Sequence, residues 1–295
     1  MFWGSHLTRN CFRVVIPTKE ESGLSRRDSS FVGMTTCEPK TYLDVLPLKL
    51  KWIPLKSEIR NLKSSFARRR LHLKSKMKKR ALLVMAKRPF PGHTKTRLCP
   101  PFSPEEAATL YECFLRDALD IVRAVPNVTP FIAYSPSEEG EYFKKLAPDF
   151  ELIPQIGANL GERLDFVLSH TLAAGFEQVA AINSDSPTLP PAYLAQAFAH
   201  LDNEAIDVVF GPCEDGGYYL IGWKQPHPRL VREIQMSTSH VLQDTLDIAR
   251  QEKLQIALLP TWYDVDTIAD LERIKAEMGE KRVEFGRHTH DFWTQ

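Results

Sequence analysis

Positive charge gathers on the segment "KRPFPGHTKTRL", residues 87–98, directly after the apolar run "ALLVMA". Lys87, Lys95 and Arg97 supply ammonium and guanidinium donors, whose natural targets are phosphate oxygens. Two prolines and Gly92 constrain the backbone between these cations. The segment matches neither the P-loop pattern nor the G-x-G-x-x-G pattern, so we predict a phosphate-binding loop of a different type. The alternative is a basic turn that only faces solvent.

A carboxylate follows a later apolar run, in "QVAAINSDSPTLPP". Asp185 lies between Ser184 and Ser186, at the point where the predicted strand ends. A carboxylate there can hold Mg²⁺ or Mn²⁺, hard cations that prefer oxygen ligands and usually keep waters and substrate phosphates as remaining ligands. The alternative is that Asp185 caps the next helix. Because one carboxylate is rarely enough for a metal site, we expect a second carboxylate to bind the same metal ion.

The segment "WYDVDT" offers that partner. Alternation in an extended chain puts Asp264 and Asp266 on the same side, and either could meet Asp185 if the segments lie near each other. We therefore predict a metal site formed by Asp185 with Asp264 or Asp266 as a second ligand. The alternative is that Asp266 and Thr267 only begin the last helix.

A further polar turn is found in "GPCEDGGYYLIG". Asp215, Gly216 and Gly217 could bring a carboxylate and backbone amides close to a polar ligand. The alternative is a hairpin turn, which needs these glycines for its own geometry. The histidines and cysteines show no spacing typical of zinc sites, and the G-x-S-x-G pattern of serine hydrolases is missing from the sequence.

Strand and helix patterns alternate from residue 80 onward. The capping pairs Ser103 with Glu106 and Thr267 with Asp270 mark helix starts, whereas Gly175 and Gly279 are typical of helix ends. The patterns predict strands over 80–86, 128–135, 150–155, 178–183, 206–212, 217–223 and 254–260. They predict helices over 104–125, 138–147, 160–174, 190–200, 239–251 and 267–278.

This alternation favours a three-layer α/β/α fold with a mostly parallel sheet covered on both faces. The adjacent strands around "CEDGG" make the sheet mixed. In such sheets, ligands bind outside the carboxyl ends of the strands, which is where the residues described above collect.

Charge divides the chain near residue 80. Residues 1–80 carry 19 Lys and Arg against 6 Asp and Glu, whereas the remaining residues carry 19 against 31. We interpret residues 1–76 as a disordered or non-native extension and Met77 as the natural start; an organellar transit peptide and a basic binding arm are the alternatives. The transferase-like domain is then 77–280, followed by a C-terminal tail, 281–295.

The cysteines and the apolar runs bear on the compartment. Five cysteines, an odd number without a C-x-x-C pair, indicate free thiols in a reducing compartment. No apolar run approaches the ~20 residues needed to span a bilayer, and the N-terminus lacks the apolar region of a secretory signal. We therefore expect a cytoplasmic protein.

The motifs "MAKRPFPGHTKTRL", "LGERL", "NSDSPTLP", "GPCEDGGYYLIG" and "WYDVDTIADL" together resemble the radical-SAM/selenodomain-associated transferase family, described as arsenosugar-type glycosyltransferases. The resemblance spans roughly residues 80–275. It implies the GT-A, or nucleotide-diphospho-sugar transferase, fold. The basic loop is also similar to that of 2-phospholactate guanylyltransferase.

The resemblance implies roles for individual residues. Lys87, Lys95 and Arg97 would contact nucleotide phosphates, and Asp185 would bind the metal with Asp264 or Asp266 as a second ligand. The nucleotide-binding set implied is Lys87, Gly92, Lys95, Arg97, Gly161, Asp215, Gly216 and Gly217. The usual D-x-D signature is replaced by Ser184-Asp185-Ser186, so a two-carboxylate clamp within that motif is missing.

We therefore expect a transferase that depends on Mg²⁺ or Mn²⁺ and uses Lys95, Arg97 and Asp185 in catalysis. Glycosyl transfer from a nucleotide-diphospho-sugar to a small-molecule acceptor is the leading hypothesis. A nucleotidyltransferase that uses a nucleoside triphosphate and releases pyrophosphate is the first alternative. A non-catalytic nucleotide-sugar-binding module is the second. We do not expect nucleic acid as a partner, although the basic arm would be the element to bind it.

Overall fold

The computed structural model describes residues 78–280 and 286–294, so the predictions for residues 1–76 lie outside the described residues. The strands are β1 (Arg80–Lys87), β2 (Thr129–Ser135), β3 (Glu151–Pro154), β4 (Gln178–Ile182), β5 (Val208–Pro212), β6 (Tyr218–Trp223) and β7 (Ile256–Leu258). The helices are η1 (Thr96–Leu98), α2 (Pro104–Arg123), η2 (Ser137–Glu139), α3 (Gly140–Leu146), α4 (Leu160–Ala173), α5 (Pro191–Asp202), α6 (Arg229–Arg232), α7 (Val241–Gln251), α8 (Ile268–Glu280) and α9 (Arg287–Thr294).

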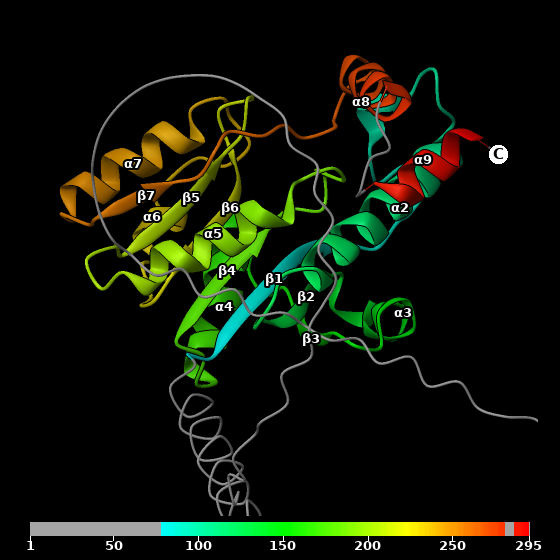
Figure 1. The fold of residues 1–295 in the computed structure, drawn as a ribbon. Helices are drawn as coiled ribbons and strands as arrows, with labels where there is room; N and C mark the ends of the chain where they lie inside the picture. Colours follow the sequence, from blue (N-terminus) through cyan, green and yellow to red (C-terminus); the bar gives the residue numbers. More distant parts are fainter. Residues whose placement is uncertain (1–77, 281–285, 295) are drawn as a thin grey trace, which may run out of the picture. The chain divides into compact units, whose positions relative to one another are not determined.

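The strands form one sheet in the order β3-β2-β1-β4-β6-β5-β7 (Figure 1). β1 is parallel to both β2 and β4, β2 is parallel to β3, and β5 is parallel to β7. Only β6 runs against its neighbours, β4 and β5. The predicted mostly parallel, mixed sheet is confirmed.

Apolar residues on both faces of the sheet explain why helices cover it twice. On β1, Leu82 and Val84 belong to one buried cluster with residues of α2, α3 and α5. Ala81 and Leu83 belong to the opposite cluster, with residues of α4, α6 and α7. Because successive side chains of a strand point to opposite faces, an uninterrupted apolar strand must be buried on both. The result is three layers, α/β/α.

Local sequence signals mark the starts of α2 and α4. Ser103 and Glu106 form the predicted capping box of α2, and the Asn159 side chain accepts a hydrogen bond from Glu162 at the start of α4. One predicted stop is wrong, because α8 continues through Gly279 to Glu280. In the described ranges, no helix is both long enough and apolar enough to cross a lipid bilayer.

Strand order brings distant loops together at one edge of the sheet. After β1 the chain moves to β2 and β3 on one side, and it returns to β4 on the other side of β1. The loops that follow β1 and β4 therefore open side by side, at the switch point where open α/β sheets bind ligands. The segment from Trp262 to Asp266 lies beside them, because Val265 N donates to Asp185 O at 2.9 Å and Trp262 N donates to Pro212 O at 3.0 Å.

The last helix, α9, packs on α2, although the sequence analysis assigned this region only to a tail (Figure 1). The buried Asp117 carboxylate of α2 receives the Thr289 hydroxyl at 2.6 Å and the backbone N–H groups of His288 and Thr289 at 2.9 and 2.8 Å. Phe102, just after the basic loop, stacks near Phe292. α9 therefore supports the base of the loop that carries the predicted phosphate contacts.

We predict that Asp117→Ala lowers the free energy of unfolding by about 1–3 kcal/mol, because it leaves buried donors of α9 without their acceptor. Urea unfolding of the full chain measures this change. Asp247→Ala is the matched control, since the contacts of Asp247 with Arg250 and Gln243 are both exposed, and it should change stability by about 0.5 kcal/mol or less. Equal effects of the two substitutions would contradict the docking role of Asp117.

Candidate active site

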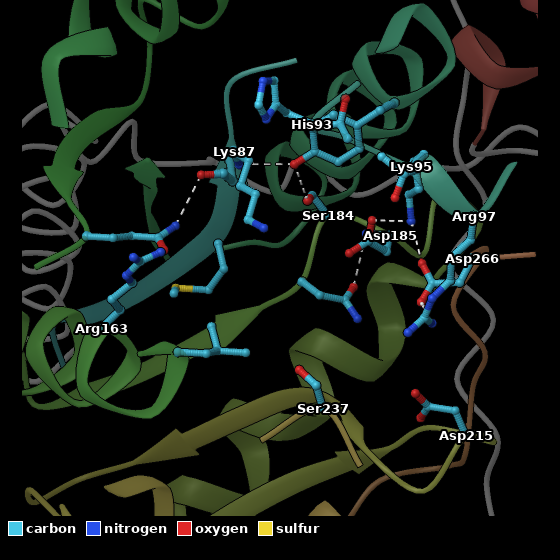
Figure 2. Close-up of a pocket in the computed structure, with 18 of the residues that line it drawn as sticks. Lys87, His93, Lys95, Arg97, Arg163, Ser184, Asp185, Asp215, Ser237 and Asp266 are labelled. Atoms are coloured by element: carbon cyan, nitrogen blue, oxygen red, sulfur yellow. Dashed lines mark hydrogen bonds and ion pairs between the residues drawn. The ribbon is translucent and has the colours of Figure 1, made fainter. Parts of the chain in front are cut away.

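A pocket of about 740 Å³ lies at the carboxyl ends of β1 and β4. This volume falls in the range of roughly 300–1,000 Å³ that small-molecule sites occupy. Predicted site residues that line it are Lys87, Lys95, Arg97, Asp185, Asp215 and Asp266. In Figure 2, Lys87 and Arg163 lie on one side of the pocket, with Lys95, Asp185 and Asp266 on the other.

Lys95 is held by three oxygens. Its ammonium pairs with Asp185 Oδ1, and it donates to Asp266 Oδ1 and to the Val265 carbonyl at 2.8 Å each. The side chain is only 6% exposed. Burial alone would lower the pKa of Lys95, but the charges of Asp185 and Asp266 outweigh it and raise the pKa above its usual value. The interpretation of this part of the loop as a solvent-facing turn is therefore wrong.

The loop backbone directs Lys95 inward. Lys95 adopts a left-handed conformation with φ of 48°, which is uncommon for a residue other than glycine. Next to it, Leu98 is fully buried in a cluster with Phe114 and Val265. The ammonium of Lys95 also lies 5.5 Å from the centre of the Phe114 ring. Packing of the loop against α2 and the segment that precedes α8 thus fixes a cation between two carboxylates.

Asp185 is positioned by the network at the ends of β1 and β4. The Tyr111 hydroxyl hydrogen-bonds with Ser184 Oγ at 2.9 Å and accepts from Lys87 N at 3.0 Å. Burial raises the pKa of Tyr111 to about 12, so this hydroxyl stays protonated. The Asp185 side chain turns to Lys95 and does not cap α5, whose N-cap is Pro190. Asp185 therefore faces the pocket, and its role as a ligand-binding carboxylate stays a prediction.

The two aspartates of "DVD" have different surroundings. Asp266 pairs with Lys95 at 2.8 Å and lies 3.7 Å from Arg97 Nη1. Burial alone would raise the pKa of Asp266, but these two cations lower it. Thr267, not Asp266, caps α8, because Asp270 Oδ2 receives the Thr267 N–H and hydroxyl at 2.8 Å each. Asp266 is therefore available to the pocket.

Asp264 lies beneath the site, outside the pocket lining. Its Oδ1 accepts from Ser186 Oγ at 2.6 Å and from Asn183 Nδ2 at 2.8 Å. Burial, followed by the charge of Asp185, raises its pKa to about 6. Of the two carboxylates predicted to meet Asp185, Asp266 is thus the one that shares a cation with it, whereas Asp264 fastens the loop after β4.

Three more cations lie around the pocket. Arg97 is 74% exposed, and Lys87 is also exposed, without a carboxylate partner among the described residues. Arg163 also lines the pocket and donates through Nε to Gly157 O at 3.0 Å. Sequence reasoning missed Arg163, although it stands in the "LGERL" motif. Each of these three cations keeps N–H donors that could bind a polyanionic ligand in the pocket.

Two of the predicted glycines, Gly161 and Gly216, are required by close packing. Gly92, Gly161, Gly216 and Gly217 lie outside the pocket lining. A Cβ at Gly161 would come within 1.9 Å of Val231 O, and one at Gly216, where φ is +88°, would come within 1.9 Å of Ser239 O. Gly216 therefore allows the neighbouring segment Ser237–Ser239, which does line the pocket, to approach the β5–β6 turn. Sequence reasoning missed this segment.

The donor set of the site suits a hard divalent cation. Asp185, Asp266 and the Val265 carbonyl present oxygens to one point, and Mg²⁺ and Mn²⁺ prefer oxygen ligands with phosphates completing the shell. Across residues 78–280 and 286–294, no group of three or more His, Cys, Asp or Glu side chains is arranged to hold a metal ion. A metal here would therefore depend on two carboxylates, the carbonyl and a ligand.

Comparisons with known proteins agree with this architecture. Residues 118–238 match the family model DUF2064, described as "Uncharacterized protein conserved in bacteria". A solved structure from Desulfovibrio desulfuricans G20, described as a "putative nucleotide-diphospho-sugar transferase", is 32% identical with a TM-score of 0.63. That match covers 67% of this chain and 87% of that one. No curated protein matches the sequence.

More distant structures share lower similarity. Glucosyl-3-phosphoglycerate synthase from Mycobacterium tuberculosis, in complex with Mn²⁺, UDP and its product, is 13% identical with a TM-score of 0.42, covering 66% of this chain and 75% of that one. A 4-diphosphocytidyl-2C-methyl-D-erythritol synthase from Anaerococcus prevotii is 12% identical with a TM-score of 0.46, covering 68% and 96%. These two likenesses carry no argument about function.

The likeness to the Desulfovibrio protein is high enough to assign the chain. The chain belongs to the same family as that protein, within the GT-A-like nucleotide-diphospho-sugar transferase superfamily. The predicted three-layer, Rossmann-like GT-A fold is thereby confirmed. The resemblance to radical-SAM-associated transferases stays a prediction.

Asp264 should make stability depend on pH. Its folded pKa of about 6 exceeds its ordinary value of 3.8, so the ionised form is disfavoured in the folded state, and stability falls as pH rises through this window. Asp264→Asn mimics the neutral form and can keep both acceptor contacts. Between about pH 4.5 and about pH 7.5, we expect the wild type to lose about 2 kcal/mol relative to this variant. Urea unfolding with a chelator present measures this difference, and a difference that does not change with pH would contradict it.

Proposed function

We propose that this chain is a metal-dependent transferase that acts on a nucleotide-activated donor, with glycosyl transfer from a nucleotide-diphospho-sugar as its reaction. The observation that carries the proposal is the joining of exposed cations, Lys87 and Arg97, to the Lys95–Asp185–Asp266 cluster in one pocket. Cations and carboxylates side by side suit a diphosphate that is bound through both direct hydrogen bonds and a shared metal.

Membership of the family supports the proposal. The Desulfovibrio relative is described as a "putative nucleotide-diphospho-sugar transferase", and its match covers 67% of this chain. The pocket lies at the switch point between β1 and β4, where open α/β sheets bind ligands. Fold alone does not define an activity, so the proposal depends on the polar residues of this pocket.

In glycosyl transfer, the protein must stabilise the negative charge of the departing nucleoside diphosphate. An acceptor oxygen forms a bond to the anomeric carbon, the bond from that carbon to the diphosphate breaks, and the electron pair leaves on the nucleoside diphosphate. The acceptor loses its proton to a base. Arg97 and Lys87 would donate hydrogen bonds to the phosphate oxygens and oppose the charge that grows there. A divalent cation held by Asp185 and Asp266 would supply further charge neutralisation.

Nucleotidyl transfer is the second candidate. Arg163 adds a cation to the predicted set of Lys87, Lys95 and Arg97, and four cations around one pocket also suit a triphosphate. In that reaction, an acceptor oxygen attacks the α-phosphorus and pyrophosphate leaves with the electron pair. The same residues would then bind the pyrophosphate portion.

We place the reaction in the cytoplasm with a small-molecule acceptor. The support is the state of the described cysteines, Cys99, Cys113 and Cys213, which are free thiols. Free thiols are typical of proteins in a reducing compartment.

A ligand and product panel tests the proposal. The full chain is mixed with Mn²⁺ and either nucleoside triphosphates or nucleotide sugars, and thermal unfolding is followed. A ligand at about 100 times its Kd should add about 2.7 kcal/mol of stability. Ligands that stabilise the protein are then assayed for release of nucleoside diphosphate or pyrophosphate. Diphosphate release supports glycosyl transfer and pyrophosphate release supports the second candidate, whereas binding without turnover indicates a binding module and contradicts both.

We predict that Arg97→Ala weakens binding of the stabilising nucleotide by about 1.5–3 kcal/mol, the range for a hydrogen bond to a charged group. Isothermal titration calorimetry measures the Kd. Arg250→Ala is the control, because this exposed arginine of α7 has Asp247 as its one ion-pair partner among the described residues and lies outside the pocket lining. Unchanged affinity in Arg97→Ala would remove Arg97 from the phosphate site.

A further inference from the structure

The ammonium of Lys95 has no donor left for a phosphate. An ammonium carries three N–H donors, and three oxygens surround this one: Asp185 Oδ1, Asp266 Oδ1 and Val265 O. Lys95 nevertheless lines the pocket beside Arg97 and Lys87. To bind phosphate, it must release at least one of the oxygens that now hold it.

The same three oxygens are the ones that suit a divalent cation. Asp185 and Asp266 face the pocket with side chains that are 32% and 40% exposed, whereas Lys95 reaches them from within the protein. We call Asp185 Oδ1, Asp266 Oδ1 and Val265 O the oxygen cage. With Lys95 in place, the cage and its lysine together carry two negative charges and one positive charge. If Lys95 leaves and a divalent cation enters, the two carboxylates are neutralised in full. Lys95 and a metal ion cannot occupy the same point.

We propose that the Lys95 ammonium competes with a divalent cation for the oxygen cage of Asp185, Asp266 and Val265. A phosphate that binds Lys95 would then favour the metal in this competition. This inference rests on the proposed function for the identity of the anion, though its first test needs no nucleotide. Phosphate and metal then bind with positive coupling, because each favours the same position of Lys95. Until the substrate binds, the Lys95 ammonium thus occupies the position between Asp185 and Asp266 that the metal ion would take.

Mn²⁺ titrations of the full-length protein test the competition. Lys95→Met removes the competing ammonium, and Lys95→Gln removes the charge but keeps a donor for Val265 O. Both should bind Mn²⁺ alone more tightly than the wild type, by about tenfold, within the 5–150-fold range of typical couplings. Electron paramagnetic resonance of free Mn²⁺ gives the Kd, and circular dichroism checks that each variant is folded.

Lys144→Met is the matched control, because Lys144 is an exposed lysine of α3 that lies outside the pocket lining. It should leave the affinity for Mn²⁺ alone unchanged. Unchanged or weaker Mn²⁺ binding in the Lys95 variants would overturn the proposal, since a merely structural or phosphate-binding lysine gives that result.

Pyrophosphate, which shares the diphosphate group of both candidate donors, tests the coupling. It should raise the Mn²⁺ affinity of the wild type more than that of Lys95→Met, after correction for the complex that the two form in solution. Equal enhancement in both proteins would overturn the coupling. If pyrophosphate binds neither protein, the proposed function fails, while the titrations with Mn²⁺ alone still decide the competition.

Discussion

A buried cation that two carboxylates share is the interaction on which this site depends. Lys95, Asp185 and Asp266 come from three loops far apart in the sequence, and the ammonium joins them at one point with the Val265 carbonyl. Burying the Lys95 ammonium without these carboxylates would be costly, so the position of Lys95 depends on the two loops that carry Asp185 and Asp266. Two features of the loop hold the ammonium in this position. The Lys95 backbone is left-handed, with φ of 48°, and Leu98 anchors the loop in a buried apolar cluster.

The rest of the fold brings these loops to one edge. β1 and β4 are parallel neighbours, and Tyr111 of α2 ties their ends together through Lys87 N and Ser184 Oγ. Asp264 extends this network by accepting from Asn183 and Ser186. The pocket therefore has an inner part, where Lys95 is held by two carboxylates, and an outer part, where the exposed cations Arg97 and Lys87 can contact an anion.

Much of this could be predicted from the sequence, because local patterns carry it. Apolar runs identified the strands, and the Ser103 capping box identified α2. The order of basic loop and acidic turns pointed to Asp185 with Asp264 or Asp266, without deciding between the last two. The ion pairs of Lys95 could not be predicted, because no local pattern shows that Lys95 contacts Asp185 and Asp266, which are distant in the sequence. Arg163 was missed because a single arginine on a helix has no distinctive pattern. Gly216 was assigned to the ligand, although its neighbour Ser239 explains it through packing.

A single structure can decide whether the basic loop and the aspartates form one phosphate-and-metal site. The direct measurement is a crystal structure with Mn²⁺ and a nucleoside diphosphate, with manganese located by its anomalous signal. The account predicts manganese between Asp185 and Asp266, with the Lys95 ammonium and Arg97 on the phosphates. A diphosphate bound outside this pocket, or bound within it while Lys95 keeps both carboxylates, would contradict the account.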